Sequence, residues 1–67
     1  MMSDESHRIL NYLSSIPHLA HKIVERKLAR EILLSTDGQL MAQGVLWRIK
    51  SKPIGAGLIE LTLKRWN

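Results

Sequence analysis

The chain has 67 residues, a formal net charge of +4 and no cysteine. This length predicts one small domain spanning residues 1–67 with a thin core, and without cysteine the chain has neither a disulfide framework nor a Cys-based metal site. No apolar run approaches the roughly 18 residues of a membrane-spanning helix. The acidic start MMSDESHR lacks the basic and apolar regions of a signal peptide, so we expect a cytoplasmic protein without a membrane partner.

The first helix is predicted to begin at Ser3. The hydroxyl of Ser3 can cap the helix, and Asp4 and Glu5 then lie at the positive end of the helix dipole. Pro17 is expected to end this helix, because proline disfavours helical geometry in the residue before it. Between these limits the apolar residues recur at helical spacing and form one face: Ile9, Tyr12, Leu13 and Ile16, with Leu10 at the edge.

A second helix is predicted from Pro17 to about Lys27, because proline is favoured in the first turn of a helix. Lys27 and Glu31 would enter its apolar face if the helix continued. From Leu28 onward a period of two fits better, which indicates a strand. The apolar face of this second helix would consist of Leu19, Ala20, Ile23, Val24 and Leu28.

Three runs with a period of two are predicted to form a meander after the helices. The first ends at Thr36, the second spans residues 39–50 with Gly44 as a bulge, and the third spans residues 58–66. Asp37-Gly38 is the expected hairpin turn, since glycine accepts a positive φ, and residues 53–57 form the second break. The predicted fold class is therefore α+β, with two short N-terminal helices followed by a three-stranded antiparallel β-meander.

The alternation also predicts the two faces of this sheet. A dry face, covered by the helices, would hold Val45, Trp47, Ile49, Ile59, Leu61 and Leu63. A wet face would hold Leu46, Arg48, Lys50, Glu60, Thr62 and Lys64. We expect Arg48 or Lys50 to lie beside Glu60 on the wet face, and Trp47 to be part of the core.

Residues 39–50 also fit a helix, because their apolar residues occur at helical offsets and Gln, Leu, Met and Ala are good helix formers. The chain would then have three helices and a C-terminal strand. On this apolar spacing, the C-terminal half resembles a shortened winged-helix DNA-binding domain, with residues 28–49 as the helix-turn-helix. Whether residues 39–50 form a strand or a helix is the alternative that the sequence leaves open.

Two groups of cations indicate nucleic-acid binding. On the predicted second helix, His18, Lys22 and Arg26 lie four residues apart and Arg30 follows, so Lys22, Arg26 and Arg30 are predicted to contact phosphates. The wet face supplies Arg48, Lys50 and Lys64, next to Trp66, which would either stack on a base or fold over the end of the sheet. We expect a small, basic, non-enzymatic regulator that binds nucleic acid, DNA in preference to RNA.

A protein-interaction module or inhibitor is the alternative function. Apolar residues near the wet face and unpaired sheet edges would build an interface with another protein or with a second copy of the chain. In size and charge the chain resembles short accessory proteins of phages and mobile elements. His18, His21 and Glu25 have a weak metal-ligand spacing without the HExxH order, and no nucleophile motif is present, so we predict no metal, no cofactor and no catalytic residue.

Overall fold

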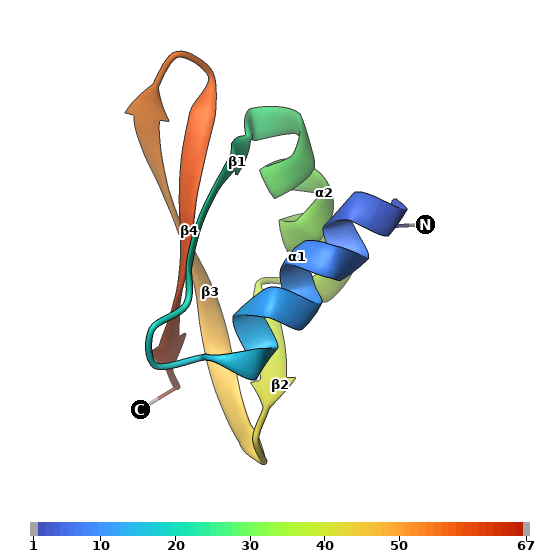
Figure 1. Ribbon diagram of the computed structural model, residues 1–67, viewed down its shortest axis with the longest axis vertical. Helices are drawn as coiled ribbons and strands as arrows, with labels where there is room; N and C mark the ends of the chain where they lie inside the picture. The colour runs from blue at the N-terminus through green and yellow to red at the C-terminus, as the bar shows by residue number, and fades with distance from the viewer. Residues whose placement is uncertain (1, 67) are drawn as a thin grey trace.

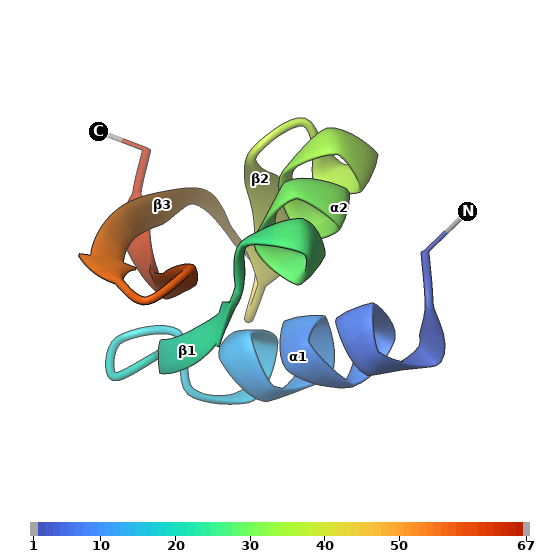
Figure 2. The same ribbon diagram turned by 90° about the horizontal axis from the view of Figure 1, so that it is seen from above.

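The computed structural model describes residues 2–66 as an α+β fold in which two helices cover one face of a curled, four-stranded antiparallel sheet (Figures 1 and 2). The strand order is β1-β4-β3-β2, so the long β3–β4 hairpin forms the centre of the sheet. No helix within residues 2–66 is long and apolar enough to cross a membrane. The elements in chain order are α1 (Asp4–Ser15), β1 (His21–Glu25), α2 (Arg26–Thr36), β2 (Gln39–Ala42), β3 (Val45–Gly55) and β4 (Leu58–Arg65).

The first helix confirms its prediction at both ends. Ser3 is the N-cap of α1, and its hydroxyl accepts a hydrogen bond from the Ser6 N–H at 3.2 Å. The helix ends at Ser15, two residues before Pro17. Its inner face buries Ile9, Leu10 and Leu13, whereas Tyr12 and Ile16, which the sequence placed on the same face, are 41% and 38% exposed.

The predictions for residues 17–36 are wrong in both parts. A turn follows Pro17, residues 21–25 form β1, and the run predicted as the first strand is α2. The strand β1 buries only Val24, so its sequence shows no clear period of two. The helix α2 instead buries Ala29 and Ile32, which lie three positions apart on one helical face.

Glu31 lies at the junction of the two helices, although the sequence pattern predicts that it would disrupt the apolar face of a helix through this segment. Its Oε2 accepts hydrogen bonds from the Ser6 hydroxyl at 2.5 Å and from the Ser3 N–H at 2.6 Å. These hydrogen bonds, that from Ser6 first, lower the pKa of Glu31 from 4.5 to about 2. The carboxylate therefore joins the first turn of α1 to α2, which is why a helix through Glu31 is tolerated.

The turns also differ from their predictions. Asp37-Gly38 is the C-terminal cap of α2 rather than a hairpin turn: Asp37 is left-handed at φ 58°, and the Gly38 N–H donates to the Leu33 carbonyl at 3.1 Å. The hairpin turn between β2 and β3 is Gln43-Gly44, with φ of 53° and 74°, so Gly44 is a turn residue and not a bulge. Ala56-Gly57 joins β3 to β4, after an irregularity between Pro53 and Gly55.

Residues 39–50 form β2, the Gln43-Gly44 turn and the first half of β3, so the alternative with three helices is wrong. The sheet has four strands rather than three: the predicted first strand is α2, the predicted second strand is divided into β2 and β3, and β1 is an additional strand. The dry face is otherwise as predicted: Trp47 is 3% exposed, Leu61 is fully buried, and Ile49 and Ile59 lie beside them. The core joins this face to both helices through Ile9, Leu10, Leu13, Val24, Ala29 and Ile32.

Candidate nucleic-acid interface

Four cations lie on the outer face of the β3–β4 hairpin, the face away from the helices. Arg48, Lys50 and Lys52 alternate along β3 with the inward-facing Trp47 and Ile49. Across the strand pair, Arg48 is opposite Lys64, Lys50 is opposite Thr62 and Lys52 is opposite Glu60. Residues directly opposite each other share a face of the sheet. We call this group, Arg48, Lys50, Lys52 and Lys64, the cation strip.

Arg48 and Lys64 are a pair of like charges in direct cross-strand opposition. Within residues 2–66 one salt bridge forms, between His21 and Glu60, and it involves neither of these cations. Like charges directly opposite each other destabilise an antiparallel pair, by an amount on the order of 0.2–1 kcal/mol. The positive potential of this part of the sheet is therefore not neutralised from within the described chain, and an external anion would relieve the repulsion.

The acid at the other end of the strip has a different neighbour from the one expected. Glu60 lies directly opposite Lys52 and diagonal to Lys50, and it is not next to Arg48. The Ala56-Gly57 turn and the irregularity at Pro53 and Gly55 shift the register of the two strands, and the sequence pattern did not reveal that shift. In this register, the half of the strip that contains Arg48 and Lys64 has no acidic residue directly across the strands.

Trp66 lies against the cation strip. Its ring centroid is 4.3 Å from the Arg48 guanidinium carbon, a cation–π contact, and its backbone N–H donates to the Leu46 carbonyl at 3.3 Å. The residue is 41% exposed, in contrast to the buried Trp47. The structure thus places one partly exposed aromatic ring at the end of the strip where Arg48 and Lys64 meet.

The other predicted group, Lys22, Arg26 and Arg30, does not form the expected helical stripe. Lys22 belongs to β1 and its Nζ lies 5.7 Å from the centroid of the Tyr12 ring, on the side of the helices. Arg26 and Arg30 are exposed and one turn apart on α2, so they remain neighbours of each other. Lys52, which the sequence analysis missed, continues the alternation of Arg48 and Lys50; the break predicted at residues 53–57 hides the continuation of the strand past Lys50.

The weak metal-ligand spacing does not assemble into a shared site. The His21 Nε2 lies 2.5 Å from the Glu60 Oε2, across the sheet, and the His18 ring meets the Trp47 ring edge-on with centroids 5.1 Å apart. Among residues 2–66, no three His, Asp or Glu side chains are close enough to hold a metal ion. The histidines therefore have other neighbours in this fold.

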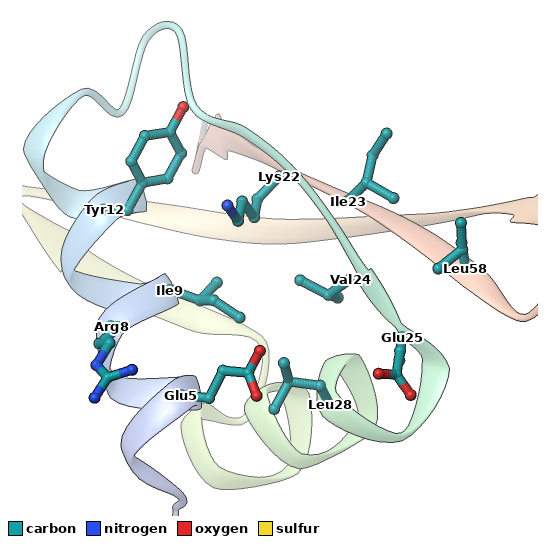
Figure 3. Close-up of a pocket in the computed structure, with 10 residues that line it drawn as sticks. All are labelled: Glu5, Arg8, Ile9, Tyr12, Lys22, Ile23, Val24, Glu25, Leu28 and Leu58. Carbon is teal, nitrogen blue, oxygen red and sulfur yellow. The ribbon is translucent and has the colours of Figure 1, made fainter.

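A groove on the other side of the molecule is the second feature of the surface. It lies between α1, β1 and the start of α2 and has a volume of about 490 Å³ (Figure 3). It is lined by the apolar side chains of Ile9, Val24, Leu28 and Leu58 and by charged side chains that include Glu5, Lys22 and Glu25. The groove and the cation strip lie on different surfaces, because Val24 packs with the helices whereas the strip faces away from them.

Comparison with known proteins finds no matching family model, no matching curated protein and no matching solved structure. The interpretation of the site therefore depends on the geometry described above, above all on the cation strip and Trp66.

Proposed function

We propose that the protein is a small, non-enzymatic regulator that binds nucleic acid through the outer face of the β3–β4 hairpin. The observation that supports this proposal best is the direct opposition of Arg48 and Lys64 beside Trp66, without an acidic partner across the strands. Such an arrangement costs stability in the free protein and is relieved when phosphates approach. DNA is the primary ligand that we propose.

The spacing of the strip suits a nucleic-acid backbone. Side chains two residues apart on a strand are separated by about 6.6–6.8 Å, so Arg48, Lys50 and Lys52 span about 13 Å along β3. Arg48 can contact a phosphate through two N–H groups at once, whereas the lysines act as single positive charges. Trp66 offers a surface for stacking a base, which is worth roughly 1–3 kcal/mol in single-strand binding proteins. Together these groups favour an unpaired or locally opened strand.

Binding is tested by fluorescence anisotropy with end-labelled single-stranded DNA, duplex DNA and RNA of one sequence. We expect binding to the wild-type chain at low salt and a marked loss in Arg48→Glu, which reverses one charge of the strip. The matched control is Arg30→Glu, which makes the same change on exposed α2. No binding of any of the three ligands at low salt would end the proposal, and equal losses in the two variants would remove the outer face as the site.

A protein partner remains the second candidate function, on one observation. Met41 and Leu46 are directly opposite each other on β2 and β3, and they are 63% and 37% exposed. They form an apolar neighbour to Arg48 at the same end of the sheet. Binding that tolerates high salt but is lost in Met41→Lys would favour this function, because burial of apolar surface is insensitive to ionic screening.

A further inference from the structure

The strand β1 forms one edge of the sheet and has an unpaired side. Within residues 2–66 it pairs only with β4, from His21 opposite Thr62 to Glu25 opposite Leu58. The Arg26 N–H donates to the Gly57 carbonyl at 2.9 Å, which continues this ladder by one further rung. Hydrogen-bonded and non-hydrogen-bonded pairs alternate in an antiparallel ladder. Val24 and Lys22 are therefore bonded to β4, and the N–H and C=O groups of His21, Ile23 and Glu25 point to the open side.

The groove runs along this open side (Figure 3). One wall is β1 and the other is α1, and the ends of the groove differ in charge. Lys22 lies beside Tyr12 at one end, and Glu5 and Glu25 lie toward the other end. At the centre of β1, the side chain of Ile23 is 45% exposed. The edge thus combines unpaired backbone groups, an exposed apolar residue and opposite charges at its two ends.

We propose that the partner of this edge is a second copy of the chain, which pairs its own β1 antiparallel to the first about a two-fold axis at Ile23. In that register every outward-pointing residue meets another outward-pointing residue: Ile23 meets Ile23, and His21 meets Glu25 twice. Each of these pairs exchanges two backbone hydrogen bonds. A shift by one residue would oppose outward-pointing groups to groups already bonded to β4, so the neighbouring registers are excluded.

The side chains are complementary in the same register. On the outer face, the two Ile23 side chains touch at the axis, and each His21, whose Nε2 contacts Glu60 of its own chain, lies opposite Glu25 of the other copy. On the groove side, Lys22 of one copy lies opposite Val24 of the other, and so approaches the end of the groove where Glu5 lies. A two-fold axis brings unlike ends together by symmetry, since the same surface serves both subunits. An edge strand with this self-complementarity fits its own copy better than an unrelated peptide.

The other edge of the sheet is a weaker candidate for this contact. The strand β2 has four residues, Gln39–Ala42, and none of them is charged, so it offers no charge pattern that selects a partner or a register. Pairing through β1 would instead join the two sheets into one of eight strands, with both cation strips on the same outer face. The dimer is proposed from β1 and the groove alone and does not depend on nucleic-acid binding.

The test is the oligomeric state of the full chain in the absence of nucleic acid, by sedimentation equilibrium over a range of concentrations. We expect a monomer–dimer equilibrium whose Kd rises at least about tenfold in Ile23→Lys, because two like charges then face each other at the axis in place of an apolar pair. The matched control is Ile54→Lys, since Ile54 is 44% exposed and lies on β3, which does not pair with β1. This control should leave the Kd unchanged.

Amide hydrogen exchange of the wild-type chain provides a second readout that requires no variant. The Ile23 N–H should exchange fast at low protein concentration and become protected as the concentration rises. The Val24 N–H, bonded to β4 in both states, should stay protected throughout. A monomer at every concentration, equal effects of the two lysine substitutions, protection of β2 in place of Ile23, or protection of Ile23 only after an unrelated peptide is added would each overturn the proposal.

Discussion

The salt dependence of DNA binding is the sharpest test of the cation strip. The perturbation is the double variant Lys50→Gln and Lys64→Gln, which removes two of the four cations on the outer face. Both side chains are exposed and neither forms a salt bridge within residues 2–66, so the fold should be retained. Glutamine keeps most of the length of lysine, and so the variant isolates the loss of charge.

The expected magnitude follows from counterion release. If all four cations contact phosphates of a single strand, the logarithm of the binding constant falls with the logarithm of salt concentration with a slope of about −2.8. An increase from about 50 to about 200 mM salt then weakens binding about 50-fold in the wild-type chain. With two contacts removed the slope is about −1.4, and the same increase weakens binding only about 7-fold.

The assay is fluorescence anisotropy with a labelled single strand at a series of salt concentrations. The control is Arg26→Gln with Arg30→Gln, which removes two exposed cations from α2 on the other side of the molecule. Its slope should equal that of the wild-type chain. A wild-type slope near zero, or the same reduction in both double variants, would refute the assignment of phosphate contacts to the strip.

Three further predictions concern the fold. The pKa of Glu31 is lowered from 4.5 to about 2, so its carboxylate stabilises the folded chain above about pH 5, and this stabilisation is lost as the pH falls toward 2. In Ser6→Ala, which removes the main hydrogen bond to this carboxylate, acid unfolding followed by circular dichroism should begin at higher pH. Ala56 has a left-handed φ of 56° before Gly57, so Ala56→Asn should raise the free energy of unfolding by about 0.5–1 kcal/mol in urea titrations. Leu61 is fully buried, so Leu61→Ala should lower the free energy of unfolding by about 2–5 kcal/mol. The whole free energy of unfolding of a chain of this length is about 3–10 kcal/mol, so a strongly lowered Tm is the expected result.

Elements whose signals are local were predictable from the sequence. The helix α1 has a serine cap, two acids in its first turn and a proline after its end, and each of these acts within a few residues. The strands β3 and β4 alternate apolar and polar residues because one face packs on helices and the other faces solvent. Their buried positions, including Trp47 and Leu61, were therefore assigned correctly.

Residues 17–36 were not predictable in the same way, for two physical reasons. The helix α2 begins after Glu25, whose side chain makes no capping hydrogen bond, so the sequence contains no start signal. Its Glu31 is stabilised by Ser3 and Ser6, which lie 28 and 25 residues away, and no local pattern reveals such a partner. Because the start is unmarked and Glu31 would enter the apolar face of a helix, the sequence pattern favours a strand over a helix.

The Asp37-Gly38 pair shows a related ambiguity. A left-handed residue followed by glycine is required both in a two-residue hairpin and at the C-terminal cap of a helix. The dipeptide specifies the backbone angles but not the element that precedes it. The choice depends on the class of residues 28–36, so the error in the first strand and the error in the first turn are one error.

Arg48, Lys50 and Lys64 share one face of the sheet despite these errors, because this placement depends on the alternation of side chains within β3 and β4 and not on the elements before them. Side chains two residues apart in a strand share a face, so Arg48 and Lys50 lie together wherever β3 is placed, and Lys64 joins them once β4 pairs with β3. The alternation of side chains does not, however, determine which residues of the two strands lie opposite each other. The shift near Pro53 moves Glu60 opposite Lys52 and leaves Arg48 opposite Lys64, so the like-charge pair that distinguishes this surface came from the three-dimensional structure alone.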